Sequence, residues 1–271
     1  MNSKFLSVEM TGSIAVVTMQ RADKRNAINE ALLNALNDFF SAPPADCRVV
    51  VLQGDGAHFC SGLDLAERLN RPNRDAFERV RNSRKWHNVF EKIEHGEIPV
   101  ISVLKGGVIG GGLELAASTH IRVAQEDTFF QLPEGQHGIF VGGGGSVRIP
   151  RIIGAGQVVE MMLTARKMDV LEGRQLGLVH YQAPTGAATE LAMSLAHKVA
   201  RNAFLSNYAI VNAISRIQDM GSADGLFAES MVASLAASSR EGDERIAGFF
   251  DRLSARKEVP ATSPIPPPPN A

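Results

Sequence analysis

The chain has 271 residues, enough for one large domain or two smaller ones with an ample hydrophobic core. Its charged fraction of 21% and formal net charge of −1 are ordinary for a globular protein, and they give no electrostatic argument for binding nucleic acid or an anionic membrane. The two cysteines form neither a disulfide framework nor a metal-ligand spacing, and no apolar run is long enough to cross a bilayer. We therefore expect a soluble, cytoplasmic protein without a metal site.

Predicted strands and helices alternate through the first two-thirds of the chain. They are a hairpin at 5–19, a helix at 27–40 with Asn26 as its cap, a buried strand at 48–52, a helix from 63, a long helix at 71–94, a buried strand at 99–104, a helix from 113, a strand at 120–124 and short helices at 146–153 and 156–164, joined at Pro150 and Gly154. A helix is also expected from 170 and a short strand at 179–182.

From residue 187 onward the predicted elements are helices alone. They span 188–202, 207–218, 225–237 and 241–256. The tail from 260 is rich in proline and predicts an extended, mobile segment. Alternating elements followed by helices indicate an α/β body with a helical C-terminal part. We divide the chain into a core at 1–195, a helical region at 196–258 and a flexible tail at 259–271.

The stretch from Lys105 to Ser118 is the most informative part of the sequence. It joins the strand at 99–104 to a helix through a glycine-rich turn, so free backbone N–H groups are expected where the helix begins. Such groups suit a substrate oxygen that gains negative charge during a reaction. Glu114 is the one charged residue in the apolar helix start, and it either forms a structural ion pair or takes part in the reaction.

Other candidates have simple structural interpretations beside the functional ones. Glu134 lies between a proline and a glycine, where an acidic turn residue can serve solvation alone. Asp64 is a better candidate for a helix cap than for chemistry. Cys60 is expected to be a small packing residue, and His137 a surface or packing histidine that could also tune the site.

The glycine run at 142–145 resembles a phosphate-binding loop only superficially. It lacks the lysine of a P-loop, and neither glycine stretch of the chain fits the GxGxxG pattern of dinucleotide-binding folds. We expect this run to let the backbone lie close to a substrate pocket.

Four motifs in order give the chain a family resemblance over residues 5–257. They are Arg21-Ala-Asp-Lys-Arg-Asn-Ala27, Phe59-Cys-Ser-Gly-Leu-Asp-Leu65, Gly110-Gly-Gly-Leu-Glu-Leu-Ala116 and Phe130-Gln-Leu-Pro-Glu-Gly135. With them the chain resembles the crotonase (enoyl-CoA hydratase/isomerase) superfamily. The resemblance implies a spiral of ββα units with a helical C-terminal trimerisation region, and a homotrimer or a homohexamer.

The resemblance also implies the chemistry and its residues. The thioester carbonyl of an acyl-CoA would lie between the backbone N–H groups of Leu63 and Gly111. Glu114 would mainly position and activate water, while Glu134 would transfer a proton at the α-carbon; two carboxyl groups can share these tasks. Coenzyme A is then part of the substrate, and no separate cofactor is expected.

Further residues are expected to bind the substrate or its CoA part, with the basic ones as candidates for the CoA phosphates. They are Lys24, Arg25, Ala27, Ser61, Asp64, Leu65, Gly110, Pro133, Gly142, Phe250 and Lys257. In the family, a lysine follows shortly after the aspartate that corresponds to Asp64, in the loop that carries Leu63 (the oxyanion loop). Ala66 stands in its place here, so the CoA contacts depart in part from the family pattern.

Two glutamates favour a hydratase over an isomerase, and Gly142 stands where dienoyl-CoA isomerases are expected to carry an aspartate. The segments around Trp86 and after Gly138 are similar to the methylthioacryloyl-CoA hydratase branch, with a general short-chain enoyl-CoA hydratase as the other interpretation. An isomerase or a thioester hydrolase with the same oxyanion hole is an alternative. A non-catalytic RNA-binding role is another, and the neutral charge argues against it.

Overall fold

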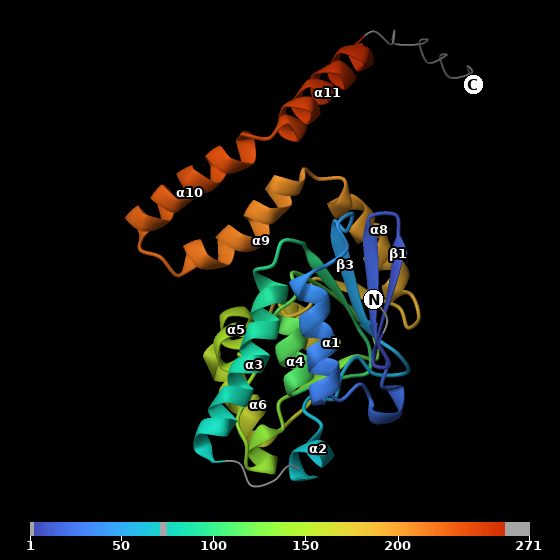
Figure 1. Cartoon of the computed structure of the whole chain (residues 1–271), viewed down its shortest axis with the longest axis vertical. Coiled ribbons are helices and arrows are strands. Elements are labelled where there is room, and N and C mark those ends of the chain that lie inside the picture. Colours follow the sequence, from blue (N-terminus) through green and yellow to red (C-terminus); the bar gives the residue numbers. More distant parts are fainter. Residues whose placement is uncertain (1–2, 71–74, 258–271) are drawn as a thin grey trace, which may run out of the picture.

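Figure 1 shows an α/β body from which a helical arm extends toward the C-terminus. The computed structural model describes residues 3–70 and 75–257, with side chains up to residue 250. The strands are β1 (Leu6–Thr11), β2 (Ile14–Met19), β3 (Val49–Gly54), β4 (Val100–Leu104), β5 (Gly107–Ile109), β6 (Ile121–Gln125), β7 (Phe129–Gln131), β8 (Met168–Asp169) and β9 (Tyr181–Ala183).

The helices separate the strands and then continue alone. They are α1 (Glu30–Ser41), α2 (Leu65–Asn70), α3 (Ala76–Glu94), α4 (Gly111–Ala117), α5 (Gly145–Ile153), α6 (Ala155–Thr164), α7 (Val170–Gln175), α8 (Ala188–Ala200), α9 (Phe204–Gln218), α10 (Ser222–Ala237) and α11 (Arg240–Lys257), with short 3-10 helices η1 (Ala22–Lys24) and η2 (Glu134–His137). The α/β class predicted from the sequence is confirmed.

The main sheet has six strands in the order β1-β2-β3-β4-β6-β9. Only the β1–β2 hairpin is antiparallel; the other neighbours pair in parallel. Both faces of the central strands are covered, which explains their continuous apolar runs. Along β3, Val49 and Val51 pack toward Ala192 of α8, whereas Val50 and Leu52 belong to the larger core on the other face. A smaller sheet consists of β5, β7 and β8; in the chain, β5 directly precedes α4 and β7 directly precedes η2.

The start of α1 differs from the prediction. The helix begins at Glu30, and its cap is Asn29, whose side chain accepts a hydrogen bond from the N–H of Leu32 at 2.9 Å. Asn26, which we predicted as the cap, is fully buried and donates its amide hydrogens to the carbonyls of Asp55 and His58. A helix cap satisfies N–H groups of its own first turn. Asn26 instead ties the loop before α1 to the loop after β3.

Other boundaries also differ from expectation: α2 begins at Leu65 and not at 63, while α9 and α10 begin earlier than predicted, at Phe204 and Ser222. Helix α3 begins at Ala76, with Asp75 as its cap, and residues 71–74 of the predicted helix lie outside the described part of the chain. Pro150 lies inside α5 and does not end it, because the break between α5 and α6 falls at Gly154. Gly154 has φ +87, a left-handed value that favours glycine.

Helices α9, α10 and α11 form the arm seen in the upper part of Figure 1. Helix α10 packs on α9, and α11 packs on α10. No helix in the described ranges combines the length and apolarity needed to cross a bilayer. The division at residues 195 and 258 stays a prediction, and the tail at 259–271 lies outside the described residues.

Candidate active site

A cavity of about 770 Å³ brings the predicted catalytic residues together. Its walls come from the loop before α2, from α2 and α3, from the turn between β5 and α4, and from η2 with the glycine run that follows. Leu63, Gly111, Glu114 and Glu134 all line it, although they are up to 71 positions apart in the sequence. Volumes of this order are typical of small-molecule sites.

Glu114 lies in the first turn of α4 and is 3% exposed. Its Oε1 accepts hydrogen bonds from the N–H groups of Gly143 and Gly145, both at 2.8 Å. Burial raises the pKa of Glu114, while these amides and the charge of Arg148 oppose the rise. The carboxyl group is therefore held in a fixed position by donors that favour its charged form.

The glycine run is the cradle of this carboxyl group, a contact that the sequence did not indicate. A Cβ atom on Gly145 would lie 2.8 Å from both Cγ and Oε1 of Glu114, and one on Gly143 would lie 2.8 Å from the ring of Phe90. Side chains at these positions would therefore push the loop away from Glu114. The expected proximity of the run to the acyl pocket is also present, because Gly142 and Gly143 line the cavity.

Glu134 has a different environment, although it lines the same cavity. It is 5% exposed, and within the described part of the chain its Oε2 has no hydrogen-bond partner. Burial raises the pKa of Glu134 to about 7, and the negative charge of Glu114 adds to the rise. Gly110 passes close to it, since a Cβ there would lie 2.7 Å from Oε1. Near neutral pH the site can hold one carboxylate and one carboxylic acid, the combination that acid–base catalysis needs.

The two amides predicted as an oxyanion hole meet at the wall of the cavity. A Cβ on Gly62 would lie 2.9 Å from the nitrogen of Gly111, so the two backbone segments are in close contact. The Gly62 carbonyl accepts from the N–H of Ile28, and the N–H of Asp64 donates to the Ile28 carbonyl, so the N–H of Leu63 takes no part in this pairing. Across the described residues, neither the Leu63 nor the Gly111 amide donates a hydrogen bond to another protein group. Both are available to a ligand oxygen.

Asp64 caps α2, as predicted from the sequence. Its Oδ1 accepts from the N–H of Glu67 at 3.1 Å, and its Oδ2 pairs with Arg21 at 2.9 Å. Burial acts to raise the pKa of Asp64, but the hydrogen bonds from Glu67 and Arg21 lower it overall. Arg21 also donates to the carbonyl of Ala27, so one buried arginine joins the first motif to the oxyanion loop. Sequence reasoning did not single out this role of Arg21.

The predicted substrate-binding residues divide into three groups. Those that line the cavity are Ser61, Asp64, Leu65, Gly110, Pro133 and Gly142. Lys24 and Arg25 are exposed and do not line the cavity, but their backbone carbonyls accept hydrogen bonds from Ser61. Ala27 is buried and does not line the cavity either. Phe250 is exposed on α11 and does not line the cavity, and the side chain of Lys257 lies outside the described part.

The cavity also contains residues that sequence reasoning did not assign to it. Arg68 and Arg79 line it, and they add positive charge in the region where the family's lysine is replaced by Ala66. Trp86 lies against Gly111, where a Cβ would be 2.8 Å from its ring. The position of Arg68 at the end of α2 was visible in the sequence, whereas the approach of α3 to α4 was not.

Other chemistry-bearing groups are engaged in structural contacts. Cys60 is fully buried, its thiol donates to the carbonyl of Asn26, and burial raises its pKa to about 12, as suits a packing residue.

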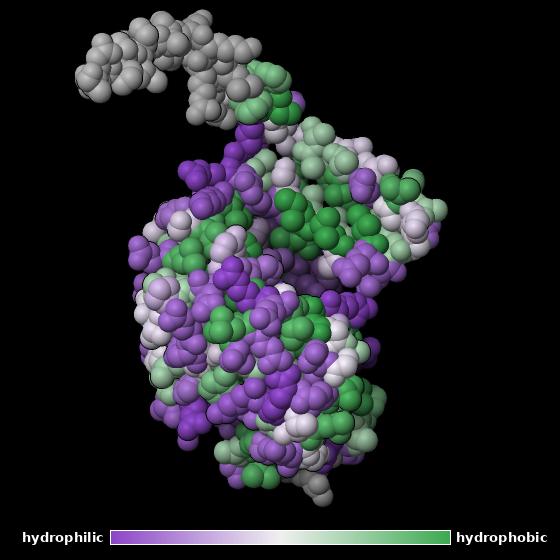
Figure 2. Space-filling view, turned by 180° about the vertical axis from the view of Figure 1, so that it is seen from behind, coloured by the Kyte–Doolittle hydropathy of each residue, from purple (hydrophilic) through white to green (hydrophobic). Residues whose placement is uncertain are grey.

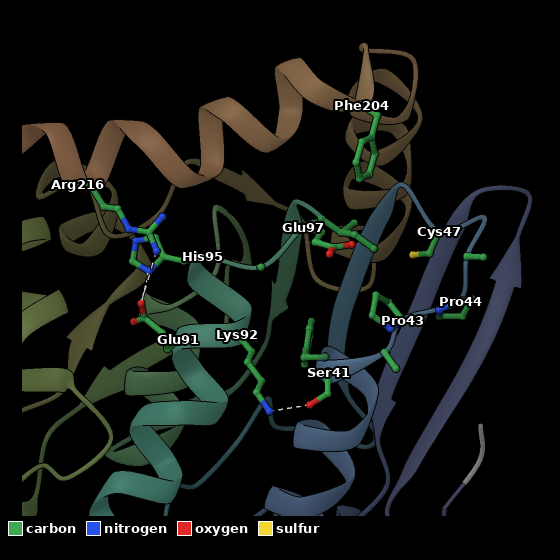
Figure 3. A pocket seen from close by; sticks show the side chains of 15 residues that line it. Ser41, Pro43, Pro44, Cys47, Glu91, Lys92, His95, Glu97, Phe204 and Arg216 are labelled. Atoms are coloured by element: carbon green, nitrogen blue, oxygen red, sulfur yellow. Dashed lines mark hydrogen bonds and ion pairs between the residues drawn. The ribbon is translucent and has the colours of Figure 1, made fainter. Parts of the chain in front are cut away.

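A second cavity of about 430 Å³ lies near Glu91, His95 and Arg216 (Figure 3), and it contains none of the predicted site residues. His137 is exposed and lines the main cavity.

Comparisons with known proteins agree with this geometry. The family model for enoyl-CoA hydratase/isomerase matches residues 9–257. A crystal structure from Rhodopseudomonas palustris CGA009, provisionally assigned as an enoyl-CoA hydratase, is 43% identical, with a TM-score of 0.89 over 93% of this chain and 97% of that one. The enoyl-CoA hydratase structure from Bacillus anthracis is 29% identical, with a TM-score of 0.85 over 92% and 96%.

A curated relative, the 2,3-dehydroadipyl-CoA hydratase of Escherichia coli (strain K12), is 29% identical over 249 residues, which are 91% of this chain and 96% of that protein. Sequence and structural similarity thus extend over nearly the whole chain. The chain therefore belongs to the enoyl-CoA hydratase/isomerase family and has the crotonase fold.

Proposed function

We propose that this enzyme adds water across the α,β double bond of a short-chain enoyl-CoA thioester. The observation that carries the proposal is the pair of buried glutamates in one cavity. Two amides hold Glu114, whereas Glu134 has an unpartnered oxygen and a pKa raised to about 7. An isomerase that moves one proton needs only one such group, whereas hydration needs one group for the water and another for the α-carbon.

The reaction begins with the thioester oxygen between the N–H groups of Leu63 and Gly111. Glu114, as carboxylate, takes a proton from water while the water oxygen bonds to the β-carbon. The electrons of the double bond move toward the carbonyl, and the two amides stabilise the negative charge on its oxygen. Glu134, as carboxylic acid, donates its proton to the α-carbon. One water has then been added, and a proton passes from Glu114 to Glu134 before the next cycle.

The proposed acyl group is short, with methylthioacryloyl-CoA as the preferred substrate. Support comes from the sequence resemblance around Trp86 and after Gly138, and from the position of both segments in the walls of the cavity. The same amides could also stabilise hydrolysis of the thioester after hydration. The test compares kcat/KM for crotonyl-CoA and methylthioacryloyl-CoA and measures free CoA.

Each outcome of this comparison has a definite meaning. A preference for the methylthio compound supports the proposed substrate, and a large preference for crotonyl-CoA rejects it in favour of a general short-chain hydratase. Free CoA that accumulates after the hydrated product adds hydrolysis to the activity. A double bond that moves without a change in mass rejects hydration and supports an isomerase.

We also propose that the arm mediates assembly into a trimer or a dimer of trimers. Large apolar side chains are exposed along α9, α10 and α11: Ile210, Ile214, Leu226, Phe227, Met231, Leu235, Ile246 and Phe249. Figure 2 shows hydrophobic surface gathered in the upper part of the molecule, over the arm. A surface of this kind marks a protein interface.

Light scattering after size exclusion tests the assembly. The wild type should have three or six times the chain mass of 29.1 kDa. Phe227→Asp should reduce the mass to that of smaller species, whereas Glu229→Ala, on the same helix, should leave it unchanged. A wild-type protein that elutes as a monomer at micromolar concentration contradicts the proposal.

A further inference from the structure

Arg148 connects the glycine run to helix α3. Its side chain is 10% exposed, and its guanidinium contacts three groups: Nε pairs with Oε2 of Glu94 at 2.5 Å, Nη1 donates to the carbonyl of Gly143 at 3.0 Å, and Nη2 lies 3.5 Å from Oε2 of Glu91. Planar guanidinium groups with several partners are strongly fixed in orientation.

The carbonyl that Arg148 holds belongs to the same residue whose N–H group holds the carboxyl of Glu114. Gly143 donates to Oε1 of Glu114 at 2.8 Å and accepts from Arg148 at 3.0 Å. We infer that Arg148 is a positioning residue, which keeps the glycine run in the conformation that orients the Glu114 carboxylate to take a proton from the attacking water. This inference rests on the proposed role of Glu114 as the base.

The backbone of the loop is shaped around the guanidinium. Gly144 has φ +98, and a Cβ on it would lie 2.2 Å from Nη1 of Arg148. The other end of the contact is also fixed, because Glu91 pairs with His95 at 2.9 Å and lies 3.9 Å from Arg216 of α9. Figure 3 shows these three side chains next to one another. Arg148 thus joins the loop to a network that spans α3 and α9.

The charge of Arg148 acts on Glu114 as well. Among the described residues, two charged groups act on Glu114, namely Arg148 on α5 and Glu134 on η2, and Arg148 in turn pairs with Glu91 and Glu94 on α3. Arg148 lowers the pKa of Glu114, against the effect of burial. Loss of the positive charge therefore raises this pKa, and the base becomes protonated at a higher pH.

The test compares Arg148→Met, Arg148→Lys and the matched control Arg151→Met. Arg151 lies one turn further along α5, donates to the carbonyl of Val147 and pairs with Asp219 on the surface, but it does not contact the glycine run. Methionine keeps much of the length of arginine without its charge. Lysine keeps the charge but lacks the planar guanidinium group that contacts several partners at once.

For crotonyl-CoA hydration, Arg148→Met should reduce kcat by about 10- to 100-fold with little change in KM, because a misplaced base costs rate and not binding. Its acid limb in the profile of kcat against pH should move to higher pH. Arg148→Lys should keep the acid limb in place while kcat falls to an intermediate value. Arg151→Met should keep both kcat and the limb.

A substrate-free readout separates this inference from the proposed function. Protein labelled with [5-¹³C]glutamate is titrated by NMR, and the Glu114 carboxyl is assigned with Glu114→Gln. In Arg148→Met, the Glu114 carboxyl should titrate at a higher pH than in the wild type, whether or not crotonyl-CoA is hydrated. An unchanged Glu114 titration together with unchanged kcat overturns the inference, even if the variant melts earlier. A wild type without hydratase activity overturns the proposed function alone.

Discussion

Glu134 is expected to cost the folded protein stability, because its carboxyl group must lose a proton in a buried position. Burial raises its pKa from an ordinary 4.5 to about 7, and its Oε2 has no partner among the described residues. Between these two pH values the folded state binds more protons than the unfolded state. Stability attributable to this group therefore falls as pH rises from about 4.5 to about 7, and the penalty is complete above that range.

The size of the penalty follows from the same shift. A difference of about 2.5 pH units corresponds to at most about 3 kcal/mol. Solvent in the cavity screens part of this, and glutamine in place of glutamate buries an amide that also needs partners. We therefore expect Glu134→Gln to raise the free energy of unfolding at pH 8.5 by about 1–2 kcal/mol, while it abolishes most hydratase activity.

Urea unfolding at pH 5 and pH 8.5, at one fixed protein concentration, measures this effect. The gain in stability from Glu134→Gln should be clearly larger at pH 8.5 than at pH 5. Glu126→Gln, on an exposed turn, is the control and should change stability little at either pH. A variant that is less stable than the wild type at pH 8.5, or a gain that is the same at both pH values, refutes the reasoning.

Two further predictions concern the supports of the site. Gly145→Ala places a Cβ 2.8 Å from Oε1 of Glu114, so kcat for crotonyl-CoA should fall about 100-fold with a smaller change in KM. Gly156→Ala is the control and should keep kcat, because the space around its Cβ is open. Equal rates in both variants would contradict the role of the glycine run as the cradle of Glu114. Asp64→Asn breaks the pair with Arg21 and should lower the free energy of unfolding by about 1–3 kcal/mol at pH 7. Because the pKa of Asp64 is lowered, this difference should shrink as the pH falls through the acid range, and a difference that is constant with pH would exclude the ion pair as its cause.

The parts of the fold that depend on local pattern could be predicted. The apolar run before residue 53 formed β3, and the predicted helix start formed α4 with Glu114 in its first turn, although the strand β5 lies within the stretch that was predicted as a turn. The family motifs also predicted that Glu114 and Glu134 lie in one cavity, as they do. These features depend on residue type and spacing, which the sequence contains directly.

The parts that depend on long-range contacts could not be predicted. Asn26 looks like a helix cap by its position, but its partners lie about 30 residues further along the chain. The glycine run at 142–145 indicates a permissive backbone from the sequence alone. Its role as the cradle of Glu114 could not be predicted, because it depends on the packing of α5 against α4. The amphipathic pattern of α11 predicted a helix, but not that Phe250 would be exposed and would not line the cavity.

The central claim is that Glu114 and Glu134 together add water to an enoyl-CoA. Crotonyl-CoA incubated in ¹⁸O water with the wild type, Glu114→Gln or Glu134→Gln, and followed by mass spectrometry, tests it most directly. We expect the wild type to form the labelled water adduct, and each variant to lose at least about 100-fold in rate. A variant that hydrates at the wild-type rate, or a wild type that shifts the double bond without a gain in mass, contradicts the claim.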